Sequence, residues 1–74
     1  LGKAVHCKTE ELANEFLKLA DSLGFVWNDG EKLTKFNRWN TCKDKTYYRV
    51  YHDIFIVYGC VDNISDLKII EFKG

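Results

Sequence analysis

Long apolar runs and a secretion signal are both missing from this sequence. A membrane-spanning helix needs about 20 consecutive apolar residues, and no segment of the 74-residue chain approaches that length. The first residues do not form the basic and then apolar pattern of a signal peptide. We therefore expect a cytoplasmic protein without a membrane partner. Methionine is also absent, and because the chain opens with Leu1-Gly2 we expect that the native start was replaced or trimmed.

Paired cysteines and metal-binding spacings are missing too. The cysteines are Cys7, Cys42 and Cys60, an odd number at wide spacing that does not match the disulfide framework of a small secreted domain. We therefore expect reduced thiols. Neither these cysteines nor the two histidines stand at a spacing such as C-x-x-C or H-x-x-x-H. The sequence accordingly predicts no metal site and no cofactor.

Catalytic motifs are absent. The chain has no P-loop, no G-x-G-x-x-G and no EF-hand pattern, and no motif sets a serine or cysteine against a histidine. Cys42 is the best candidate for a nucleophile because it lies among cations, which lower the pKa of a thiol. A half-exposed reduced cysteine is the simpler interpretation, so we expect no enzyme activity and no catalytic residues.

The chain has no net charge, which at first argues against nucleic acid as a partner. The charges are nevertheless unevenly distributed. Segment 1–31 has three cations and six acids, and segment 50–74 has two cations and four acids. Segment 32–49 has six cations against the single acid Asp44, a net charge of +5. This middle segment is called the basic segment below.

One amphipathic helix is expected over residues 10–23. Thr9 is a suitable N-cap and two glutamates follow it in the first turn, where the helix dipole favours negative charge. Gly24 suits the left-handed position that ends many helices. The expected apolar stripe, which recurs at helical spacing, consists of Leu12, Ala13, Phe16, Leu19, Ala20 and Leu23.

Five extended segments are expected around this helix. They cover residues 3–7, 25–27, 46–51, 54–58 and 67–72. The third and fourth are rich in β-branched and aromatic residues and are separated by His52-Asp53, so they predict a hairpin. Residues 31–45 show no clear period and predict an irregular loop, with at most one helical turn. The fold prediction is a single small α+β domain over residues 1–74, in which one helix packs on a mostly antiparallel four- to five-stranded sheet in the order β-α-β-β-β-β.

Side chains alternate along a strand, so Tyr47, Arg49 and Tyr51 project to one side of the hairpin and Tyr48 and Val50 to the other. The pattern leaves open which set meets the helix. Tryptophan is common both in cores and at interfaces. We assign Trp27, beside the helix end, to the core and treat Trp39 as the interface candidate.

Cations and aromatic rings are interleaved through the basic segment and the hairpin. Cations attract phosphate and rings stack on bases, so this pattern is typical of a surface for a nucleotide or single-stranded nucleic acid. The alternative is that Phe36 and Trp39 close a small core while the lysines remain in water. The predicted binding residues are Lys35, Arg38, Trp39, Lys43, Lys45, Tyr47, Arg49 and Tyr51.

The chain also resembles a group of known proteins. The resemblance rests on a short strand before Thr9-Glu10-Glu11, on Gly24-Phe25-Val26-Trp27 with Gly30 three residues later, and on the tyrosine-rich hairpin. In these features the chain is similar to the small accessory proteins of unknown function from phages and prophages of Gram-positive bacteria. The resemblance implies a non-catalytic role in the host cytoplasm, by binding a host protein, such as a defence nuclease, or a nucleotide signal.

Two further partners are expected. A single-stranded nucleic acid is the alternative ligand of the basic, aromatic face. A second copy of the chain is expected because a small sheet with one helix leaves strand edges uncovered.

Overall fold

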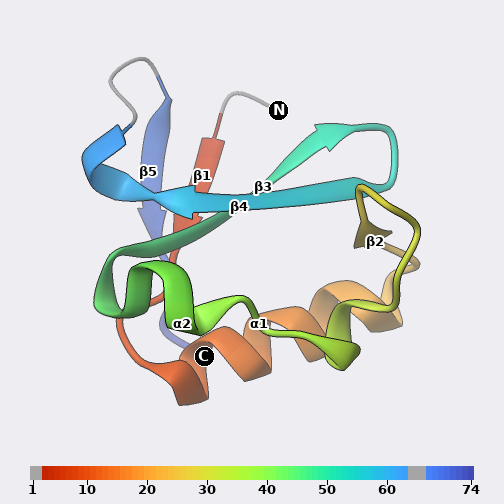
Figure 1. Cartoon of the computed structure of the whole chain (residues 1–74), viewed down its shortest axis with the longest axis horizontal. Helices are drawn as coiled ribbons and strands as arrows, with labels where there is room; N and C mark the ends of the chain where they lie inside the picture. Colours follow the sequence, from red (N-terminus) through yellow and green to blue (C-terminus); the bar gives the residue numbers. More distant parts are fainter. Residues whose placement is uncertain (1–2, 64–66) are drawn as a thin grey trace.

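The computed structural model describes residues 3–63 and 67–74. It has one five-stranded sheet, in the order β2-β4-β3-β1-β5, with both helices on the same side of it (Figure 1). The predicted α+β class is therefore confirmed. The elements in chain order are β1 (Lys3–His6), α1 (Glu10–Ser22), β2 (Val26–Trp27), η1 (Leu33–Lys35), α2 (Trp39–Cys42), η2 (Lys43–Lys45), β3 (Thr46–His52), β4 (Phe55–Cys60), η3 (Val61–Asn63) and β5 (Lys68–Glu71), where η denotes a 3-10 turn.

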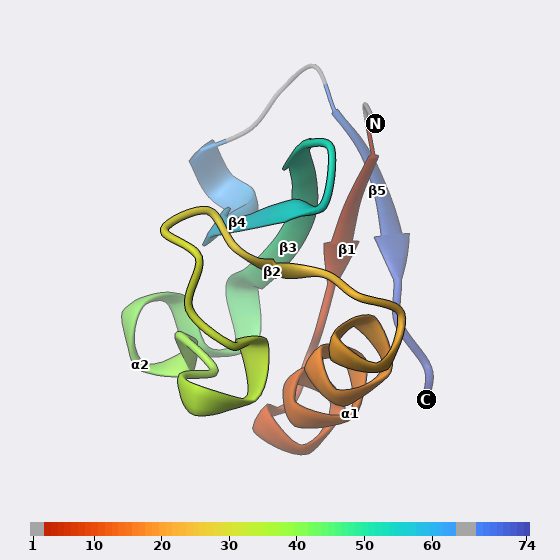
Figure 2. The ribbon, with the colours of Figure 1, turned by 90° about the vertical axis from the view of Figure 1, so that its right-hand side faces the viewer.

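The sheet is mixed, so the prediction of a mostly antiparallel sheet was wrong. β3 runs antiparallel to β4 and to β1, whereas β5 runs parallel to β1 and β2 runs parallel to β4. Figure 2 shows β1 and β5 side by side on one flank of the sheet. Parallel neighbours need long connections, and the local turn signals from which strands are recognised in a sequence do not reveal such pairs.

Helix α1 begins and ends as its sequence predicts. The Thr9 hydroxyl accepts a hydrogen bond from the Leu12 N–H at 3.1 Å, which satisfies one of the free donors of the first turn. At the other end Leu23 is the C-cap, and Gly24 follows with φ of 97°. A side chain at this φ would be strained, so glycine fits the position.

Four of the six predicted stripe residues face the core, namely Leu12, Ala13, Phe16 and Ala20, but two do not. Ala13, Leu17 and Ala20 are buried, while Leu19 and Leu23 are 52% and 69% exposed. Leu17 and Leu19 both lie at helical spacing from the other stripe residues, and the prediction chose Leu19 where the structure buries Leu17. The two alanines face the rest of the fold, which allows a closer approach of the helix, and Leu17 lies between them on the same face.

The predicted hairpin is confirmed, and the structure settles which of its sides meets α1. The rings of Tyr48 and Phe16 stack with their centroids 5.6 Å apart, and Val50 also packs against the core. Tyr47 and Arg49 therefore lie on the opposite face of the sheet, and Tyr51, where the register shifts, joins them through its contact with Arg49. Tyr47 is nonetheless only 8% exposed, because its ring lies across Gly59 of the neighbouring strand.

The core lies between α1 and the sheet. Its largest fully buried side chains are those of Leu17, Trp27, Leu33, Tyr48 and Ile56. Trp27 is 2% exposed, which confirms its assignment to the core.

Residues 31–45 are more ordered than the sequence predicts. They contain the turns η1 and η2 and a second helix, α2, so the prediction of a single helix was wrong. Helix α2 is only four residues long and leaves no periodic pattern. Its ends are set by backbone conformation, since Arg38 before it and Lys43 after it have φ of 60° and 51°.

A disulfide joins Cys42 and Cys60, whose Cα atoms are 5.3 Å apart. The expectation of reduced thiols was therefore wrong for these two residues, whereas Cys7 is free and buried. The pair was not visible in the sequence because it forms only once the hairpin brings the end of β4 beside α2. The cytoplasmic location stays a prediction, and the disulfide counts against it because such bonds are typical of oxidising compartments.

Candidate functional site

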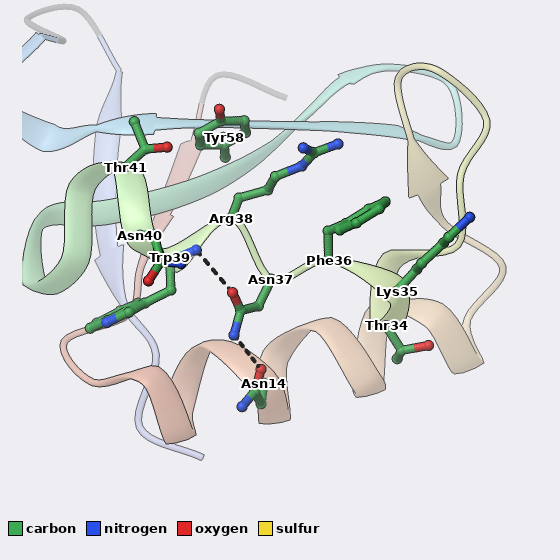
Figure 3. Close-up of a pocket in the computed structure, with 10 residues that line it drawn as sticks. All are labelled: Asn14, Thr34, Lys35, Phe36, Asn37, Arg38, Trp39, Asn40, Thr41 and Tyr58. Atoms are coloured by element: carbon green, nitrogen blue, oxygen red, sulfur yellow. Dashed lines mark hydrogen bonds between the residues drawn. The ribbon is translucent and has the colours of Figure 1, made fainter.

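A polar pocket of about 450 Å³ opens between α1, the chain from η1 to α2, and strand β4 (Figure 3). Segment 34–41 supplies most of its lining, with one residue from α1 and one from β4. The lining residues are Asn14, Thr34, Lys35, Phe36, Asn37, Arg38, Trp39, Asn40, Thr41 and Tyr58.

Two core side chains fix the backbone of the pocket wall. The Trp27 indole N–H donates to the Phe36 carbonyl at 3.1 Å, and the Tyr48 hydroxyl donates to the Asn37 carbonyl. Burial raises the pKa of Tyr48, so the phenol keeps the proton that it donates. Buried donors need acceptors, and here the wall of the pocket provides them. The rings and the wall therefore hold each other in place.

Asn37 connects the wall to α1. Its side-chain amide donates to Glu10 at 2.8 Å. The same amide donates to Asn14 at 3.0 Å, and its side-chain oxygen accepts the Trp39 N–H at 3.0 Å (Figure 3). Both polar atoms of this side chain are thus used within the protein. Asn37 is a positioning residue, and it orients the start of α2.

The Arg38 guanidinium is surrounded by aromatic rings. Its central carbon lies 4.9, 5.3 and 5.8 Å from the ring centroids of Phe36, Trp27 and Tyr58, a distance range in which cation–π attraction operates. The nearest carboxylate oxygen, of Asp29, is 3.9 Å away, too far for a hydrogen bond. Among the described residues none accepts a hydrogen bond from this guanidinium, although its side chain is only 32% exposed.

Lys35 and Trp39 lie on either side of Arg38 in the pocket lining. The Lys35 ammonium pairs with Glu31 at 3.1 Å and lies 5.6 Å from the centroid of Phe36. Trp39 is half-buried and packs against the core with part of its surface. Three of the eight predicted binding residues, Lys35, Arg38 and Trp39, therefore come together at one site.

The hairpin residues of the prediction lie elsewhere. Tyr47, Arg49 and Tyr51 project from the face of the sheet that the helices leave uncovered. The Arg49 guanidinium lies 5.6 Å from the ring centroid of Tyr51. Tyr51 is 59% exposed. The structure thus divides the predicted binding face between the two sides of the sheet.

Lys43 and Lys45 belong to η2 and do not line the pocket. The Lys45 ammonium pairs with Asp62 at 2.7 Å, and the hydrogen bond and charge of that carboxylate raise the pKa of Lys45.

Acids from outside the basic segment neutralise much of its charge. Four of its six cations have a carboxylate partner from the flanking segments within 4.0 Å. These pairs are Lys32 with Asp21, Lys35 with Glu31, Arg38 with Asp29, and Lys45 with Asp62. The positive segment of the sequence is therefore not a positive surface of the same size in the folded chain.

The eight predicted binding residues do not include the pocket's amides or two of its three rings, Phe36 and Tyr58. Asn14 lies on the polar side of α1, and Tyr58 lies on β4, opposite Tyr48 in the register. Isolated asparagines carry no motif. Tyr58 could have been found only from the pairing of β3 with β4, which places it on the helix side beside segment 34–41.

Within residues 3–63 and 67–74, no cluster of three or more His, Cys, Asp or Glu side chains is suited to hold a metal ion. In the same ranges no helix has both the length and the apolar character that a membrane crossing requires. Comparison with known protein families, curated proteins and solved structures finds no significant match to this chain.

Proposed function

We propose that this chain is a non-catalytic binding protein and that the pocket around Arg38 takes a small ligand with both an anionic group and a planar ring, such as a nucleotide. One observation carries the proposal. The guanidinium is held by three rings, and although it forms a long ion pair with Asp29 at 3.9 Å, no described residue accepts a hydrogen bond from it. Such a preorganised cation binds an anion with little further loss of side-chain freedom.

Different lining residues can bind different parts of such a ligand. Arg38 provides charge-assisted hydrogen bonds, which suit phosphate or carboxylate oxygens. Trp39 and Phe36 offer ring surface on which a base can stack. Asn40 and Thr41 add an amide and a hydroxyl for the polar edge of that base.

A small ligand fits better than a nucleic-acid strand. Binding of a strand depends on several unscreened cations along its path. Here Lys32, Lys35 and Lys45 are each paired with a carboxylate, and Arg49 lies on the other side of the sheet. Single-stranded nucleic acid is accordingly the second outcome of the test below.

A phage accessory role stays part of the proposal and rests on the sequence resemblance alone. In that role the protein would act without turnover, by withholding a nucleotide signal from a host process. A host protein partner is the alternative form of the same role.

The test is a titration followed by tryptophan fluorescence, since Trp39 lines the pocket and Trp27 adjoins it. The probes are adenosine and guanosine monophosphate, a cyclic dinucleotide, and a short single-stranded oligonucleotide at two salt concentrations. The variant is Arg38→Asn, because asparagine tolerates the left-handed φ of 60°. The control is Arg49→Asn, on the opposite face of the sheet.

We expect a mononucleotide or dinucleotide to bind, and we expect Arg38→Asn to weaken it about 10- to 100-fold, the value of a charge-assisted hydrogen bond. Arg49→Asn should bind like the unmodified chain. Failure of every nucleotide to bind, or equal binding by the Arg38 variant, would contradict the proposal. Salt-dependent binding of the oligonucleotide alone would favour the nucleic-acid alternative.

A further inference from the structure

We infer that the Cys42–Cys60 disulfide controls the pocket, so that the ligand binds the oxidised protein and is released when the disulfide is reduced. This inference rests on the proposed function, because it concerns the same site. It adds that ligand binding is regulated by the thiol redox state of the surroundings.

The disulfide connects two walls of the pocket. Cys42 is the last residue of α2 and Cys60 is the last residue of β4. Helix α2 contributes Trp39, Asn40 and Thr41 to the lining, and β4 contributes Tyr58 (Figure 3). One covalent bond therefore sets the position of the α2 wall relative to the β4 wall.

Besides the disulfide, α2 is held mainly at its start, where Asn37 accepts the Trp39 N–H and the Trp39 ring packs against the core. The helix spans four residues and none of them is buried, and a helix of this length is far below what forms by itself in water. The residues on both sides of it, Arg38 and Lys43, have positive φ without being glycine, a conformation that costs roughly 1–2 kcal/mol for an L residue. Once the disulfide opens, this segment can relax to less strained conformations.

The rest of the fold does not depend on the disulfide in the same way. The pairing of β3 with β4 extends from Thr46 to His52, and the hydrogen bonds from Trp27 and Tyr48 hold Phe36 and Asn37 on the other side of α2. Reduction should therefore loosen residues 38–45 and leave the sheet, α1 and the core in place.

The chemistry of the switch is ordinary thiol–disulfide exchange. A thiolate of a dithiol reductant attacks one sulfur of the Cys42–Cys60 bond and forms a mixed disulfide, and the second protein sulfur leaves as a thiolate. The other thiol of the reductant then displaces the first protein sulfur. The dithiol becomes a disulfide, and its two electrons and two protons are transferred to the two protein sulfurs.

The test compares nucleotide affinity with and without dithiothreitol in three proteins: the unmodified chain, Cys42→Ser/Cys60→Ser, and Cys7→Ala as the control that keeps the disulfide. If the reduced pocket is formed about one-tenth of the time, its affinity falls about tenfold. We expect this loss in the reduced unmodified chain, in the reduced control, and in the double variant under both conditions. Equal affinity in the oxidised and reduced unmodified chain would overturn the inference.

A second readout needs no ligand. Trypsin should cleave after Lys43 and Lys45 several times faster once the disulfide is reduced, whereas cleavage after Lys18, within α1, should keep its rate. Unchanged cleavage after Lys43 and Lys45 overturns the inference whether or not a nucleotide binds. Faster cleavage in a protein that binds no nucleotide would instead remove the proposed function and leave the disulfide as the element that orders α2.

Discussion

The Nδ1 atom of His6 lies 2.7 Å from a carboxylate oxygen of Glu71, which joins the first strand of the sheet to the last. The other ring nitrogen, Nε2, lies 2.6 Å from the carbonyl oxygen of Asp44 in η2. Both partners are acceptors, so both ring nitrogens need a proton. The site thus selects the charged imidazolium.

The pKa of His6 reflects this geometry. Burial lowers it, but the hydrogen bonds to the Asp44 carbonyl and to Glu71, together with the charge of Glu71, outweigh burial and the opposing charge of Lys8, and the pKa is raised. A raised pKa in the folded state stabilises the protein fully below the unfolded value of about 6.5. That stabilisation is lost as the pH rises through the pKa of the folded state.

We therefore predict that the free energy of unfolding falls between pH 6 and pH 8.5 by about 1 kcal/mol, the net value of a typical hydrogen bond. Urea unfolding at a series of pH values measures it. His6→Gln is the control, since glutamine does not titrate, and its stability should vary less with pH. An identical pH dependence in this variant would show that His6 is not the responsible group.

Removal of the disulfide should destabilise the fold. Cys42 and Cys60 are 18 residues apart, and closing a loop of about 15 residues contributes about 3 kcal/mol by restricting the unfolded chain. We predict a loss of about that size for Cys42→Ser/Cys60→Ser in urea unfolding. The reduced unmodified chain should lose a similar amount, while Cys7→Ala should be insensitive to reductant. Equal stability with and without reductant would show that the disulfide does not form.

Relief of backbone strain should stabilise the chain at Lys43. Its φ of 51° and ψ of −123° belong to a region that glycine occupies readily and other residues do not. We predict that Lys43→Gly raises the free energy of unfolding by about 1 kcal/mol. Asp53→Gly is the matched control, because aspartate at φ of 57° tolerates the left-handed region better. A stability gain at position 53 as large as that at 43 would contradict this account.

A methyl group at Gly59 should be costly. A Cβ atom there would lie 2.6 Å from the hydroxyl oxygen of Tyr47 and 2.7 Å from the adjacent ring carbon, well inside van der Waals contact. We predict that Gly59→Ala destabilises the protein by about 2 kcal/mol, as overpacking does, and lowers its melting temperature. In a double-mutant cycle with Tyr47→Ser most of that cost should disappear. Strict additivity of the two changes would show that the ring is not responsible.

The parts of the fold that were predicted from the sequence are those with local causes. Thr9 and Gly24 mark the ends of α1 because caps act within one turn, and the hairpin is visible because its strands are adjacent in the chain. The parallel pairs and the disulfide depend on segments far apart in the sequence. Leu19 was wrongly assigned to the buried side of α1 for a related reason, since the choice between Leu17 and Leu19 depends on what the helix packs against.

The same distinction between local and long-range causes explains which residues of the candidate site were predicted. Lys35, Arg38 and Trp39 are near one another in the chain and share the pocket. Arg49 and Tyr51 lie apart from them because alternation along β3 sets them opposite Tyr48, and the sequence did not say which side meets α1. The neutralisation of the basic segment was also hidden, since its carboxylate partners come from other segments.

The pairing of β1 with β5 has a consequence for how this protein folds in a cell. The partners His6 and Glu71 are 65 residues apart in the chain, so β1 has no outer neighbour until a ribosome has released residue 71. The hairpin of β3 and β4 can assemble while synthesis continues, but this flank of the sheet can close only afterwards. Because such non-local pairing slows folding, we expect closure of this flank to limit the rate at which the native state appears.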